Sequence, residues 1–156
     1  MSLLILTDEK KKELSNVASL IALARLPYKF GAKPNPKIDP ERLARQNEPS
    51  DCSGMTKYLL YQVGYEIPDG SINQFEASEP IEDKDIITGD LIFKKTFDTG
   101  IIEHVGIYIG NSLIVEAEGW YGMTIRRPFS SFKTCNPKAA QYAGARRLML
   151  EKIKTI

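Results

Sequence analysis

The sequence of 156 residues has little net charge, a single histidine and two cysteines. Its 21 basic and 20 acidic residues give a formal net charge of +1, which is too balanced for a protein that binds a nucleic-acid backbone. Because His104 is the only histidine, the usual Cys and His sets of a zinc site are excluded, and we expect no metal. Cys52 and Cys135 are too few for a framework of disulfides, so we expect two free thiols.

The sequence also lacks a long hydrophobic run. No apolar stretch approaches the roughly 18 residues of a membrane-spanning helix. The apolar start, residues 1–6, leads directly into two acids and three lysines, which is not the order of a secretory signal. We therefore expect a protein made in the cytoplasm without a membrane span. Its composition, 42% hydrophobic and 26% charged, is typical of a globular chain, and its length predicts a single domain over residues 1–156.

The first half of the chain has helical patterns separated by a polar segment. Apolar residues at helical spacing after Thr7 predict an amphipathic helix over 8–25. Residues 33–50 are rich in proline and polar side chains, and they predict a long surface loop with at most a short turn of helix at 41–45. A second helix is expected from residue 50 or 51 to residue 63, because both positions carry good helix caps.

The second half has short segments with the alternation of strands. These segments cover residues 89–93, 104–109, 113–117 and 123–126. The pattern of 144–150 fits a last strand or a helix equally well. The fold class is therefore α+β, with N-terminal helices packed on a small antiparallel sheet.

Cys52 falls in the first turn of the second predicted helix. Unpaired backbone N–H groups and the positive end of the helix dipole both favour a thiolate there. His104 lies on a strand face with Gly106, away from the aliphatic residues on the other face. We expect Gly106 to leave room for the helix end that carries Cys52. A thiol and an imidazole brought together in this way would form a nucleophile and its base.

An acidic partner for the imidazole can be predicted from strand pairing. Glu116 lies directly opposite His104 if the intervening hairpin has an odd-length loop such as residues 109–111. A two-residue turn at 110–111 would instead set Glu116 opposite Val105, with its carboxylate on the wrong face. Glu118 shares the face of Glu116 and is the alternative third residue.

Three segments in order resemble the NlpC-type cell-wall cysteine peptidases, a bacterial and phage family with a papain-like fold. They are residues 51–54 (DCSG), 89–93 (GDLIF) and 104–111 (HVGIYIGN), preceded by 27–31 (PYKFG). The resemblance extends from residue 8 to about residue 150. The third catalytic position is often histidine in the family, and an acid there is similar to phage-associated members.

The resemblance implies a role for each matching residue. Cys52 would be the nucleophile, His104 the general base and acid, and Glu116 the third residue. Tyr28 would lie beside the oxyanion, and the polar neighbours of the nucleophile, Asp51 and Ser53, would hold the free amine of the substrate. No cofactor is implied. The substrate would be a peptidoglycan stem peptide, cut at the bond between D-glutamate and the diamino acid, and we expect a monomer.

Two other functions remain open. A papain-like acyltransferase or amidase would use the same cysteine and histidine, and a silent tail or wall-binding module would keep the fold without the chemistry. Cys135 is expected to be an incidental thiol. Delivery to the wall by phage lysis or a secretion apparatus, and action on wall peptides in the cytoplasm, are both compatible with the missing signal.

Overall fold

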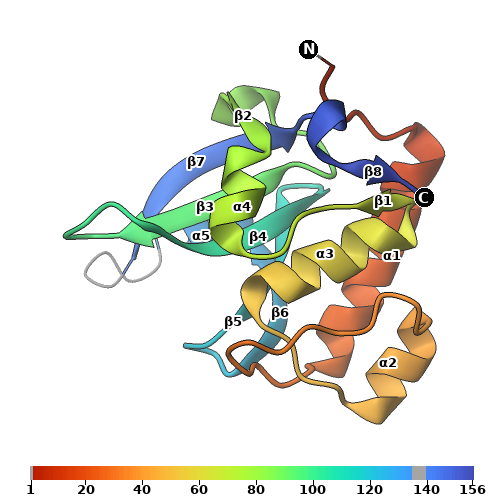
Figure 1. Ribbon diagram of the computed structural model, residues 1–156. Coiled ribbons are helices and arrows are strands. Elements are labelled where there is room, and N and C mark those ends of the chain that lie inside the picture. The colour runs from red at the N-terminus through yellow and green to blue at the C-terminus, as the bar shows by residue number, and fades with distance from the viewer. Residues whose placement is uncertain (1, 135–139) are drawn as a thin grey trace.

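The computed structural model describes residues 2–134 and 140–156, and its main feature is a six-stranded antiparallel sheet (Figure 1). The strands follow the order β2-β7-β3-β4-β5-β6. Their bounds are β2 Ser78–Ile81, β3 Leu91–Thr96, β4 Ile102–Gly110, β5 Leu113–Glu118, β6 Met123–Pro128 and β7 Ala140–Leu148. Strands β3 to β6 form the predicted meander, and residues 144–148, left open between strand and helix, belong to strand β7.

The helices are α1 (Asp8–Ala24), α2 (Pro40–Gln46), α3 (Cys52–Gln62), α4 (Ser71–Glu76) and α5 (Phe129–Thr134). The first is capped as predicted, because the Thr7 side chain accepts a hydrogen bond from the N–H of Lys10. A second, two-stranded sheet pairs β1 (Tyr65–Glu66) with β8 (Lys154–Thr155). Short 3₁₀ turns occur at Asp83–Asp85 and Leu150–Lys152.

Two cores lie on opposite faces of the large sheet. The main core joins α1 and α3 to the face formed by Val105, Ile107 and Ile109, all of them buried. The smaller core, around Phe132 of α5, covers the other face. This confirms the expected α+β arrangement, in which helices and sheet each bury one apolar surface. Among the described residues no helix is long and apolar enough to cross a membrane.

The segment 33–50 is more structured than a surface loop. Asp39 caps the helix α2, Pro40 occupies its first position, and Leu43 is completely buried. The segment before α2 is tied to α3, because the Tyr58 hydroxyl donates to the Ile38 carbonyl at 2.7 Å. The turn of helix allowed at 41–45 is therefore present and extends over residues 40–46, where a good cap and one buried leucine stabilise it.

Candidate active site

Cys52 is the first residue of α3, at the N-terminus that the sequence predicted. Asp51 caps this helix through a 2.7 Å hydrogen bond from the N–H of Gly54 to its Oδ1. A side chain at Gly54 would collide with this cap, because a Cβ atom there would lie 2.8 Å from the same oxygen and 2.9 Å from the Ala32 carbonyl oxygen. The glycine therefore lets the segment before α2 pass directly over the start of the helix.

His104 is buried on β4 and faces two carboxylates. Its Nε2 lies 2.7 Å from Oε1 of Glu116 and 3.3 Å from Oε2 of Glu118. The imidazole stacks on Phe132, with 5.9 Å between the ring centroids, and the Cys52 thiol lies close enough to raise the pKa of the imidazole. The three residues proposed from the sequence as nucleophile, base and third residue thus lie together.

The hairpin reaches this arrangement by a different register from the one expected. Its turn has two residues, Asn111 and Ser112, both in the left-handed conformation that such turns require. An irregularity at Ile109 then shifts the pairing by one residue, so that Tyr108 pairs with Ile114. The odd-length loop is therefore wrong, and the bulge, which the sequence did not reveal, returns Glu116 to the face of His104.

The role expected for Gly106 also changes. Continued along both strands, the observed pairing sets Gly106 opposite Glu116 and His104 opposite Glu118. A Cβ atom at Gly106 would lie 3.4 Å from the Cβ of Glu116 and 3.3 Å from the Val115 carbonyl oxygen. The glycine makes room for the carboxylate partner of the histidine, and none of these nearest atoms belongs to the helix that carries Cys52.

Sequence reasoning missed Arg127, which completes the buried polar cluster. Its Nε lies 2.5 Å from Oε2 of Glu116, and the guanidinium packs over the rings of Phe132 and Tyr121. Both partners of this ion pair are buried. The sequence did offer one signal, because Arg127 is a basic residue one position beyond the strand predicted over 123–126. If the alternation continued to this position, Arg127 would lie on the same face of the strand as Ile125.

Electrostatics favour charged forms throughout the cluster. Burial alone would lower the pKa of His104, but hydrogen bonds to Cys52 and Glu116 and their negative charge outweigh it and raise the pKa to about 10. Burial opposes ionisation of Glu116 too, yet His104 and Arg127 hold its pKa below the usual value. The geometry therefore stabilises an imidazolium beside the thiol.

Tyr28 lies at the edge of the same site. Its ring packs on Gly119, where a Cβ atom would approach it to 3.3 Å, and its N–H donates to the Gly122 carbonyl. Burial, followed by the negative charge of Cys52, Asp51 and Glu118, raises the pKa of Tyr28 to about 12. Its hydroxyl consequently stays protonated and can donate a hydrogen bond.

Asp51 and Ser53 are buried, and both contact the ammonium group of Lys33, whose side chain is exposed. The Nζ of Lys33 lies 2.6 Å from Oδ2 of Asp51 and 2.9 Å from Oγ of Ser53. The polar cradle that the resemblance assigns to a substrate amine is thus occupied by an ammonium group of the chain itself. The role of the two residues in holding substrate stays a prediction, and Cys135 lies outside the described residues.

Ligand atoms of His104, Glu116 and Glu118 all lie within 4.8 Å of one another, a spacing that a metal ion could bridge. His104 and Glu116 are already hydrogen-bonded to each other, and the second oxygen of Glu116 accepts from Arg127. A protonated imidazole is not a metal ligand, so the raised pKa of His104 favours the hydrogen-bonded arrangement.

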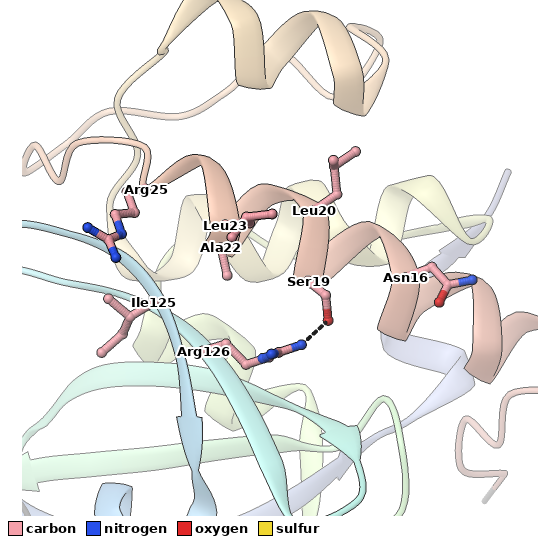
Figure 2. A pocket seen from close by; sticks show the side chains of 8 residues that line it. All are labelled: Asn16, Ser19, Leu20, Ala22, Leu23, Arg25, Ile125 and Arg126. Atoms are coloured by element: carbon pink, nitrogen blue, oxygen red, sulfur yellow. Dashed lines mark hydrogen bonds between the residues drawn. The ribbon is translucent and has the colours of Figure 1, made fainter.

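A separate pocket of about 480 Å³ lies between α1 and β6 (Figure 2). Leu20, Leu23 and Ile125 contribute apolar surface, while Arg126 reaches across the pocket and donates to the Oγ of Ser19 at 3.1 Å. Cys52, His104 and Glu116 do not line it, so it belongs to another part of the molecule.

Comparisons with known proteins agree with the motifs. The sequence is 41% identical over 69 residues to the probable endopeptidase p60 of Listeria monocytogenes, which covers 44% of this chain and 14% of that protein. It is 36% identical over 78 residues to the peptidoglycan endopeptidase RipB of Mycobacterium tuberculosis, which covers 50% of this chain and 31% of the relative. The chain thus spans less than a third of the length of either curated relative.

The fold is shared with solved structures. An NLP/P60 family protein of Staphylococcus aureus, described as similar to a lipoprotein, matches 96% of this chain and 44% of its own with a TM-score of 0.69 and 24% identity. RipB of M. tuberculosis matches 92% of this chain and 69% of its own, with a TM-score of 0.59 and 23% identity. The sequence model of the NlpC/P60 family matches residues 25–137, and the chain therefore belongs to the NlpC/P60 family.

Proposed function

We propose that the protein is a cysteine endopeptidase that hydrolyses peptidoglycan stem peptides, with Cys52 as nucleophile, His104 as general acid and base, and Glu116 as the third residue. The observation that carries this proposal is the buried hydrogen bond between His104 and the Glu116 carboxylate, with the Cys52 thiol near enough to the same ring to raise its pKa. The relatives named as endopeptidases support the substrate class.

The arrangement suits acyl transfer in two steps. The Cys52 thiolate attacks the scissile carbonyl carbon, and the developing oxyanion meets the Cys52 N–H, which has no partner within its own helix. The Tyr28 hydroxyl is a second donor at the same edge. The His104 imidazolium then gives its Nδ1 proton to the leaving amine, because Nε2 is held by Glu116, and a thioester forms as the C–N bond breaks.

Hydrolysis of the thioester uses the same residues in reverse. The neutral imidazole of His104 takes a proton from water as the oxygen attacks, and the C–S bond breaks to release a carboxylate and restore the thiolate–imidazolium pair. Glu116 holds the ring orientation and stabilises its positive charge throughout. We further propose the D-glutamyl–diamino acid bond as the site of cleavage.

Incubation of the purified protein with stem peptides, followed by mass analysis, tests this function. We expect cleavage after the D-glutamyl residue, and we expect Cys52→Ala to abolish it. Intact peptides with both proteins would contradict a peptidase and favour an acyltransferase or a non-catalytic binding module. Cleavage that persists in Cys52→Ala would contradict the assignment of the nucleophile.

A further inference from the structure

Exposed aromatic side chains gather on two segments that border Tyr28. Trp120 and Tyr121 lie on the turn between β5 and β6, with 76% and 40% of their surfaces exposed. Phe30, two residues after Tyr28, is 89% exposed. Of the described residues only one other aromatic side chain, Phe97, is comparably open, and it lies on the β3–β4 turn. Phe30, Trp120 and Tyr121 are called the aromatic rim below.

The two segments of the rim are held side by side. Pro27 bridges Met123, the N–H of Tyr28 donates to the Gly122 carbonyl, and the Tyr28 ring packs on Gly119. In Figure 1 the turn that follows β5 lies next to the orange segment after α1. The rim therefore joins two parts of the sequence that are about ninety residues apart and presents them on one framework.

The turn itself is preorganised and connected to the candidate active site. The Trp120 N–H donates to Oε1 of Glu118 at 3.2 Å, while the other oxygen of Glu118 lies 3.3 Å from His104. The ring of Tyr121 packs under the Arg127 guanidinium, 5.2 Å from its centroid. A ligand that contacts Trp120 would thus bind the turn that follows Glu118, the carboxylate in contact with His104.

The composition of the rim fits a sugar better than an apolar partner. A pyranose ring has a face of C–H groups that packs on an aromatic ring and an edge of hydroxyl groups that needs hydrogen-bond partners. The rim offers both, because Tyr121 carries a hydroxyl and the partly exposed Glu118 carboxylate lies two residues before Trp120 in the sequence. Rigid Trp and Tyr side chains also lose little conformational entropy on binding.

We propose that the aromatic rim binds a sugar of the glycan strand to which the stem peptide is attached, so that the protein recognises polymeric peptidoglycan and not the peptide alone. This inference rests on the proposed function for the identity of the polymer. It assigns the rim a part in substrate selection and leaves bond cleavage to Cys52 and His104.

The first test reads sugar binding without catalysis. Trp120 is the only tryptophan in the sequence, so fluorescence excited at the long-wavelength edge of the absorption band, where tyrosine does not absorb, reports on this side chain alone. We expect a β-1,4-linked tetramer of N-acetylglucosamine, at millimolar concentrations, to change the emission saturably and shift it to the blue. Phe30→Ala should weaken this binding by about threefold to tenfold, and Phe97→Ala should leave it unchanged.

The second test compares two substrates. Trp120→Ala should lower the ratio of polymer cleavage to free stem-peptide cleavage about tenfold, while Phe97→Ala keeps the wild-type ratio. An emission spectrum unaffected by the sugar, together with an unchanged ratio in Trp120→Ala, would overturn the inference. If neither substrate is cleaved, the proposed function fails, and the fluorescence titration still decides whether the rim binds sugar.

Discussion

Arg127 and His104 approach opposite oxygens of the same buried carboxylate. Arg127 Nε lies 2.5 Å from Oε2 of Glu116, and His104 Nε2 lies 2.7 Å from Oε1. One negative charge is therefore shared between two cations in a buried site. This relationship orients the carboxylate and favours the protonated form of the imidazole.

His104 should titrate far above the ordinary range of histidine. Because it is the only histidine in the sequence, its ring protons can be followed by NMR without assignment, and we expect a pKa of about 10. Glu116→Gln removes the charge and should lower this pKa by at least about one unit. Glu118→Gln, which alters the more distant carboxylate, should lower it less. Equal shifts in both variants would contradict the choice of Glu116 as third residue.

The raised pKa of His104 predicts how stability depends on pH. The pKa is higher in the folded state than the ordinary 6.5, so protonation stabilises the fold. This contribution is present in full below about pH 6.5 and is lost as the pH rises toward 10. Urea unfolding at pH 7 and pH 9.5 should show a larger fall in unfolding free energy for the wild type than for His104→Gln. An equal fall in unfolding free energy in the wild type and in His104→Gln would show that another group is responsible.

Removal of Arg127 should destabilise the protein strongly. Arg127→Met leaves Glu116 buried with one cation fewer, and breaking a buried pair in this way costs about 3–5 kcal/mol. Lys84→Met is a suitable control, because the Lys84–Glu82 pair is exposed and should contribute less than about 1 kcal/mol. Urea denaturation measures the unfolding free energy of both variants. A similarly small decrease in the two variants would contradict a structural role for the buried pair.

Lys33 should affect selection of the substrate amine. Its ammonium occupies the polar cradle of Asp51 and Ser53, so a substrate amine would have to replace it. Lys33→Met should raise the cleavage rate of stem peptides with a free amino terminus relative to N-acetylated ones. Lys29→Met changes the same charge on an exposed neighbour and should leave this ratio unchanged. A ratio unaffected by Lys33→Met would indicate that the cradle does not receive the amine.

The elements that depend on local sequence were predicted well. Helical spacing and the caps Thr7 and Asp51 placed α1 and α3 to within a residue or two of their ends. Sequence patterns predicted no element between residues 64 and 88, yet this stretch contains α4 and β2. Short elements of this kind have little periodicity of their own, and they are stabilised by the strands and helices against which they pack.

The site was predictable where it depends on motifs and on alternation. Alternation along β4 placed His104 on the face opposite Val105 and Ile107, as observed. The pairing of β4 with β5 was not predictable, because a bulge at one residue changes the partner of every residue beyond it. Arg127 was missed for a related reason, since its contact with Glu116 depends on a strand register that local patterns do not reveal.

The sequence by itself determined the family, the helix N-terminus that carries Cys52 and the strand that carries His104, because each follows from residues close together in the chain. The tertiary structure alone decided that Glu116 is shared with Arg127, that Lys33 fills the cradle of Asp51, and that Tyr28 bonds to Gly122. These contacts join distant segments, and their geometry is set by how the sheet pairs and how the loops pack against it.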